Sequence, residues 1–148
     1  MIANDLLKNQ QGGMYFAAEN SSIKQCVAEM VEKHVGALIV LDQNRNLQGI
    51  ISERDILRLI NEDENCKFVH TAVKDVMTPK AKLISAQTTE GLADVMDKMN
   101  RYSIRHIVIL EGERYVGLGS IRDVVRMLLD GALAENKQLM DYVYNSSL

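Results

Sequence analysis

The sequence is poor in the residue types that mark several specialised classes of protein. Its 148 residues include two cysteines, one proline and no tryptophan. Cys26 and Cys66 lie far apart, and neither belongs to a set of Cys and His residues large enough for a zinc site. The sequence therefore predicts neither a disulfide framework nor a zinc site, and we expect a protein of the reducing cytoplasm.

Long apolar runs and basic clusters are also missing. The longest apolar run covers residues 35–41, far short of the roughly 20 residues that cross a bilayer. Residues 1–11 lack the basic region and apolar core of a secretory signal. The formal net charge is −3, from 17 Lys+Arg and 20 Asp+Glu. We therefore expect neither a membrane nor a nucleic acid as a partner.

What the sequence does contain is an internal repeat. Residues 49–60 and 117–128 share Gly, Ser, Arg, Asp and a later Arg at an offset of 68. Upstream, residues 35–41 match residues 104–110 at an offset of 69, and the one-residue slip falls in a polar turn. The repeat spans about half the chain and predicts two similar structural units.

Each copy has the same predicted order of elements. A helix near residues 23–34 follows Ser21 and Ser22, and a helix near residues 92–99 follows Thr88 and Thr89. Each helix leads to an apolar run, a polar turn, a second apolar run and another helix, which predicts strand, helix, strand, strand, helix. The predicted buried stripes are Ile23, Val27, Met30, Val31 and His34 in the first copy, and Leu92, Val95, Met96 and Met99 in the second. We expect an α/β fold in which each sheet buries one face against two helices.

These patterns divide the chain into five parts. We expect an N-terminal segment over residues 1–13, a first motif over 14–65, a connector over 66–81, a second motif over 82–130 and a C-terminal helical extension over 131–148. Pro79 keeps Thr78 extended and so separates a helical turn from a strand that begins near Lys82. The extension carries more apolar residues than one motif needs, and its surplus face is a candidate subunit interface.

The repeated Gly-x-x-Ser-x-x-Asp segment is a candidate binding site. Gly117 would let a ligand approach the backbone, and Ser120 stands at a helix start whose amides attract anions. Asp123 could accept two hydrogen bonds from the vicinal hydroxyls of a ribose. The alternative is a helix-capping box without a ligand. Recurrence of the segment, with Ser52 and Asp55 in the first copy, favours the ligand.

These residues resemble a known family. Residues 36–41 and 49–55, then 75–79, then 103–110 and 117–123 are similar to a tandem pair of cystathionine-beta-synthase (CBS) domains, and the similarity runs from Met14 to Leu129. It implies two pseudo-symmetric β-α-β-β-α motifs, a Bateman module of the stand-alone type. Such modules hold an adenosine ligand in the cleft between two motifs, usually dimerise into a disc, and act through partner proteins. The implied ligands are AMP, ADP or ATP, with NAD and S-adenosylmethionine as further possibilities.

The resemblance also implies roles for individual residues. Asp55 and Asp123 would hold ribose hydroxyls, while Ser52 and Ser120 would contact ribose or phosphate. The remaining predicted contacts are Arg105 and His106 at a strand start, Arg54 and Arg122 beside the aspartates, Gly117, and Thr78 in the Met-Thr-Pro lead-in. The first copy has Gly36-Ala37 in place of Arg105-His106, and Gly12-Gly13-Met14 in place of that lead-in. We therefore expect the stronger site in the second copy.

Catalysis is not indicated, because the spacing shows no nucleophile with a base and no phosphate loop with lysine. The main hypothesis is a non-enzymatic, homodimeric, cytoplasmic adenine-nucleotide sensor that needs no cofactor or metal and signals to a regulated protein. One alternative is a protein-interaction module with vestigial clefts that docks a partner through its C-terminal helix. The other is a small hydrolase or transferase that uses Asp123 or His106.

Overall fold

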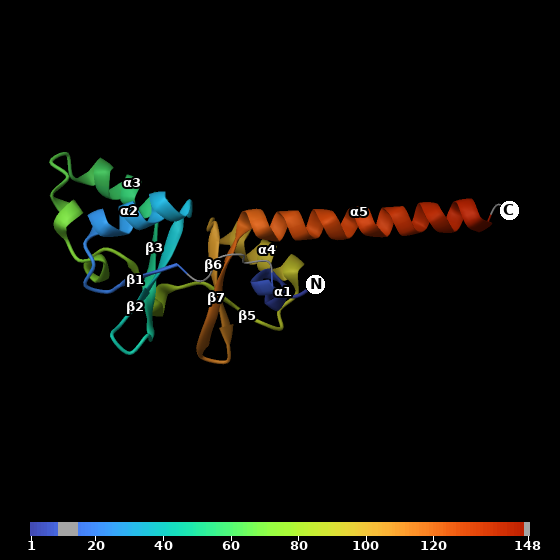
Figure 1. The fold of residues 1–148 in the computed structure, drawn as a ribbon, viewed down its shortest axis with the longest axis horizontal. Coiled ribbons are helices and arrows are strands. Elements are labelled where there is room, and N and C mark those ends of the chain that lie inside the picture. The colour runs from blue at the N-terminus through green and yellow to red at the C-terminus, as the bar shows by residue number, and fades with distance from the viewer. Residues whose placement is uncertain (9–14, 147–148) are drawn as a thin grey trace. The chain divides into compact units, whose positions relative to one another are not determined.

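The computed structural model describes residues 1–8 and 15–146. The chain forms two compact units (Figure 1). The first unit comprises residues 11–84, and the second comprises residues 1–10 together with residues 85–148. Gly12-Gly13-Met14, which stand in place of the Met-Thr-Pro lead-in, and the predicted domain boundary between residues 13 and 14 lie outside the described residues.

The first unit contains a four-stranded sheet in the order β1-β2-β3-β4. Strands β1 and β2 are parallel, whereas β3 is antiparallel to both β2 and β4. The elements are β1 (Phe16–Ala18), α2 (Ile23–Lys33), β2 (Ala37–Leu41), β3 (Leu47–Ser52), α3 (Glu53–Glu62), the 3-10 turns η1 (Lys67–His70) and η2 (Val73–Asp75), β4 (Thr78–Pro79) and the 3-10 turn η3 (Lys80–Lys82).

Residues 66–81, predicted as a connector, contribute to the first unit itself. The side chains of Phe68 and Val73 are buried in its core. Strand β4 pairs with β3, so that Thr78 lies opposite Ile50 and Pro79 opposite Gly49. The proline is tolerated because β4 is an edge strand of the described sheet.

The second unit repeats the arrangement with a three-stranded sheet in the order β5-β6-β7. Its elements are α1 (Ala3–Lys8), β5 (Ser85–Gln87), α4 (Leu92–Arg101), β6 (His106–Glu111), β7 (Arg114–Ser120) and α5 (Ile121–Ser146). Each unit therefore has the predicted order strand, helix, strand, strand, helix, which confirms the α/β fold of two repeats with an extended C-terminal helix. The packing of α1 on the second unit was not predicted: Ala3 and Leu6 are buried there.

The buried faces of the first helix in each copy differ from the prediction. In α2 the buried residues are Ile23, Cys26 and Met30, whereas Val27 and Val31 are exposed. His34 is also exposed, and it ends the helix in the left-handed conformation with a φ of 56°. The prediction was wrong for these three residues, because the face that packs on the sheet uses the neighbouring position 26. In α4 Met96 is exposed in the same way, while Leu92, Val95 and Met99 are buried.

Helix α5 is long, and most of it lies outside the core. Val124 is its only buried residue among those described, and every residue from Ala132 to Ser146 is exposed. No helix in the described ranges combines the length and the apolar character needed to cross a membrane.

Tyr115 in β7 carries a buried hydroxyl with no hydrogen-bond partner among the residues described. Burial raises the pKa of this phenol above its usual range. Because an unsatisfied buried polar group is costly, Tyr115→Phe should raise the free energy of unfolding by about 1 kcal/mol in urea titrations. Tyr102→Phe is the control, since Tyr102 is 53% exposed. A loss of stability in Tyr115→Phe would show that the hydroxyl has a partner in solution.

Candidate functional site

In the first unit, Ser52 and Asp55 form a capping box at the start of α3. The Ser52 amide and hydroxyl donate to Asp55 Oδ2 at 2.8 and 3.0 Å, and the Asp55 amide donates to Ser52 Oγ at 3.4 Å. Arg58 Nη2 donates to Asp55 Oδ1 at 2.6 Å. The carboxylate is nearly buried, with 12% of the side chain exposed. The capping arrangement left open above is thus present in the structure.

The second unit repeats this geometry at the start of α5. Ser120 Oγ donates to Asp123 Oδ2 at 2.6 Å, and the Asp123 amide donates to Ser120 Oγ at 3.2 Å. Arg126 Nη2 donates to Asp123 Oδ1 at 2.8 Å. The Asp123 side chain is 29% exposed, more than twice the value at Asp55. Of the two carboxylates, Asp123 is therefore the more accessible to a ligand.

Capping and ligand binding are compatible at a carboxylate, because its two oxygens offer about four acceptor positions. The backbone amides in the first turns of α3 and α5 are less available, because they donate hydrogen bonds within the protein. The Glu53 amide donates to the Gly36 carbonyl at 2.9 Å, and the Ile121 amide donates to the Arg105 carbonyl at 2.8 Å. The amides of Asp55 and Asp123 are bound to the serines. These four amides are used inside the protein, so the phosphate site predicted at the helix starts cannot rest on them.

Two residues of this constellation were not among the predicted site residues. Arg58 and Arg126 stand three residues after Asp55 and Asp123, and each forms an ion pair with its aspartate. The later arginine of the repeated segment was the signal that could have identified them. A spacing of three residues places two side chains on the same face of a helix.

The other predicted residues of the second unit lie at different places on its sheet. His106 begins β6 and pairs in register with Ser120, and Arg105 precedes it as an exposed residue. Arg105, His106, Ser120 and Asp123 therefore lie near the same end of the sheet. Gly117 stands three residues before Ser120 in β7 and pairs with Ile109, so it lies roughly 10 Å from this end of the sheet. The exposed Arg122 is the second residue of α5.

In the first unit, the predicted residues fall on two elements. Ser52, Arg54 and Asp55 lie at the start of α3, where Arg54 is exposed. Thr78 belongs to β4 and is half-buried opposite Ile50.

Gly117 has a structural explanation within the protein. A Cβ atom at this position would lie 2.2 Å from Cδ2 of Leu7 in helix α1. At Gly49, the equivalent position of the first repeat, the lack of a side chain makes room for the Thr78 carbonyl oxygen. A Cβ atom there would lie 2.3 Å from that oxygen. These close approaches by other parts of the chain give each glycine a structural reason, and the role of Gly117 as a ligand contact stays a prediction.

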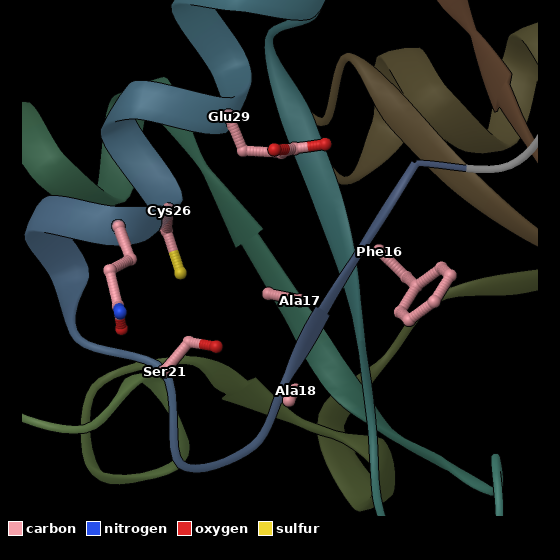
Figure 2. Close-up of a pocket in the computed structure, with 7 residues that line it drawn as sticks. Phe16, Ala17, Ala18, Ser21, Cys26 and Glu29 are labelled. Atoms are coloured by element: carbon pink, nitrogen blue, oxygen red, sulfur yellow. The ribbon is translucent and has the colours of Figure 1, made fainter.

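A separate pocket of about 190 Å³ lies between β1 and α2 in the first unit (Figure 2). It is lined by Phe16, Ala17, Ala18, Ser21, Gln25, Cys26 and Glu29, and none of the predicted site residues lines it. Its volume is below the roughly 300 Å³ at which small-molecule pockets begin. Burial raises the pKa of the Cys26 thiol to about 11, so it stays protonated at neutral pH. Within the described ranges, no group of three or more His, Cys, Asp or Glu side chains could hold a metal ion.

Comparison with known proteins relates this repeat to one family. The sequence model of the CBS domain matches residues 13–62 and 73–130. The CBS domain-containing protein CBSX3, mitochondrial, of Arabidopsis thaliana is 32% identical over 139 residues, which cover 92% of this chain and 66% of that protein.

Two solved structures agree with this assignment. A protein with CBS domains from Burkholderia ambifaria MC40-6 is 27% identical and has a TM-score of 0.78, with 88% of this chain and 95% of that chain covered. CBSX2, solved in complex with AMP, is 25% identical and has a TM-score of 0.72, with 87% and 96% covered. The two repeats are therefore a pair of CBS motifs, and the chain belongs to the CBS domain family.

Proposed function

We propose that the chain is a regulatory module that binds an adenosine-containing ligand and performs no catalysis. The observation that carries the proposal is the partly exposed Asp123 carboxylate at the start of α5, at the end of the sheet that also holds Arg105 and His106. The AMP complex of the similar CBSX2 supports an adenosine ligand.

At this end of the second unit we assign some side chains to the sugar of the ligand and others to its phosphate. Asp123 accepts hydrogen bonds from the two ribose hydroxyls, and Ser120 lies beside it. Since the amides of Ile121 and Asp123 are engaged within the protein, we assign the phosphate oxygens to side chains. The exposed Arg105 and Arg122 are the guanidinium groups placed for this.

We assign the corresponding but weaker site to the first unit. Asp55 and Ser52 bind the ribose in this proposal, and Arg54 and Thr78 are the other residues we assign to the site. Asp55 is less exposed than Asp123, and Gly36 and Ala37 stand in place of an arginine and a histidine. A nucleotide should therefore fill the second unit's site first.

In this proposal the ligand acts by changing which conformation or partner the protein favours. It can shift such an equilibrium only by its difference in affinity for the two states. The regulated activity belongs to a partner protein. We place the protein in the cytoplasm, in keeping with Cys26 and Cys66, which are both free.

The test is calorimetric titration of the full chain with AMP, ADP, ATP, S-adenosylmethionine and NAD. We expect saturable binding of at least one of them, with AMP the first choice because CBSX2 was solved with it. If folded protein binds none of the five, the proposal is wrong and the alternative of a protein-interaction module with vestigial clefts is favoured. Conversion of a bound nucleotide into a product would replace the non-enzymatic proposal by the hydrolase or transferase.

A further inference from the structure

The C-terminal helix α5 presents an exposed apolar face that the rest of the second unit does not cover. Figure 1 shows the last part of α5 extending past the other elements of this unit. Six large apolar side chains between positions 125 and 143 are 44% to 64% exposed. They are Val125, Leu129, Leu133, Leu139, Met140 and Val143. Exposed apolar residues concentrated on one helix face indicate an interaction surface.

The spacing on this face is that of a coiled coil. Positions 125, 129, 132, 136, 139 and 143 follow one another at alternating intervals of four and three residues, the pattern of the a and d positions of a heptad. We call these six residues the α5 seam: Val125, Leu129, Ala132, Asn136, Leu139 and Val143. All six are exposed in the structure. The core-facing Val124 lies outside the seam, so one helix can pack on its own unit and also pair with another helix.

From this pattern we propose that the α5 seam binds the α5 seam of a second copy of the chain, with the two helices parallel and in register. Asn136 is the single polar residue of the seam and occupies an a position. In the parallel pair each Asn136 faces its counterpart, so that the two amides can bond to one another. Shifting or reversing the helix would place Asn136 opposite an apolar residue such as Ala132 or Leu139 and leave its amide unsatisfied.

The available area agrees with a second copy. Four of the six large apolar side chains named above belong to the seam, and Leu133 and Met140 flank it. Together they expose on the order of 600 Å² per copy, so complete burial in a pair would remove up to about 1,200 Å², the lower end of stable interfaces. The charged residues between positions 125 and 143 are Arg126, Asp130, Glu135, Lys137 and Asp141, and none lies in the seam. The helix can therefore pair without burying a charge at the seam.

Sedimentation velocity of the full chain over a wide concentration range tests the proposal. We expect a reversible dimer, which Leu139→Glu should weaken at least about tenfold, because it would bury a carboxylate in the seam. Gln138→Glu adds the same charge one position away, outside the seam, and should leave the dimer unchanged. A monomer at every concentration, or a dimer that Leu139→Glu leaves intact, would overturn the proposal. Circular dichroism shows whether each variant is folded.

Cross-linking tests the parallel register separately. In a Cys66→Ser background, which removes the partly exposed native thiol, Asn136→Cys should form a disulfide between copies under mild oxidation. Gln138→Cys is the matched control and should not. If Leu139→Glu dissociates the dimer but Asn136→Cys does not cross-link, the in-register parallel arrangement is wrong. None of these measurements uses a nucleotide, so failure here leaves the proposed ligand binding untouched, and failure to bind a nucleotide leaves this inference untouched.

Discussion

Asp123→Ala is expected to weaken binding of the adenosine ligand by about one to two orders of magnitude, because hydrogen bonds to a charged acceptor contribute about 1.5 to 3 kcal/mol. The carboxylate is 29% exposed, and its bonds to Ser120 and Arg126 leave acceptor positions for ribose hydroxyls. The effect is read from the dissociation constant in calorimetric titrations of variant and wild-type protein.

The control for this variant must separate the lost charge from the lost contact. Asp130→Asn removes the same charge from the same helix at an exposed position outside the proposed site and should bind as the wild type does. Asp123→Ala also removes a capping residue, at a stability cost of about 1 kcal/mol, so thermal melting must show a folded protein. Asp55→Ala should weaken binding less. If Asp123→Ala binds the ligand with unchanged affinity, Asp123 does not contact it.

The order of elements could be predicted because it depends on local patterns. Apolar runs, a polar turn and the Gly-x-x-Ser-x-x-Asp segment occur twice, and each copy folds into the expected order. The boundaries of the packed units depend on contacts distant in sequence. Leu7 packs against Gly117, and Thr78 pairs with Ile50. No local pattern shows that the first eight residues join the second unit or that residues 66–81 join the first.

In the candidate site, too, local features could be predicted and features that depend on contacts distant in sequence could not. The Ser-x-x-Asp geometry follows from helix periodicity, since residues three apart meet on one face, and both copies have it. The Glu53 and Ile121 amides donate to the carbonyls of Gly36 and Arg105, which lie 17 and 16 residues earlier in the chain, each directly before a strand. These bonds could not be predicted from the helix segment alone. The role of Asp123 toward a ligand stays a prediction.

Gly49→Ala is expected to reduce the free energy of unfolding by about 2 to 3 kcal/mol through overpacking. A Cβ at this position would lie 2.3 Å from the Thr78 carbonyl oxygen and 2.7 Å from Met77 Sδ. Backbone cannot rotate away as a side chain can, so β4 must move off β3. Replacing glycine by alanine usually stabilises by about 0.4 to 1 kcal/mol through the unfolded state, and here that gain is smaller than the clash. Urea denaturation of both proteins measures the difference.

Gly117→Ala is the matched comparison, because it inserts the same methyl group at the equivalent position of the other repeat. Its nearest neighbour is the end of the flexible Leu7 side chain, at 2.2 Å. Leu7 can change rotamer, so the expected loss is about 1 kcal/mol. Adding Leu7→Ala should relieve the strain of Gly117→Ala, giving a double variant more stable than the sum of the two single effects predicts. Shortening the Met77 side chain would not fully relieve Gly49→Ala in this way, because the nearest atom to the new Cβ is the backbone carbonyl oxygen of Thr78. Equal losses at the two glycines would show that Leu7 is held as rigidly as backbone, and unchanged stability in Gly49→Ala would contradict the close packing of β4 on β3.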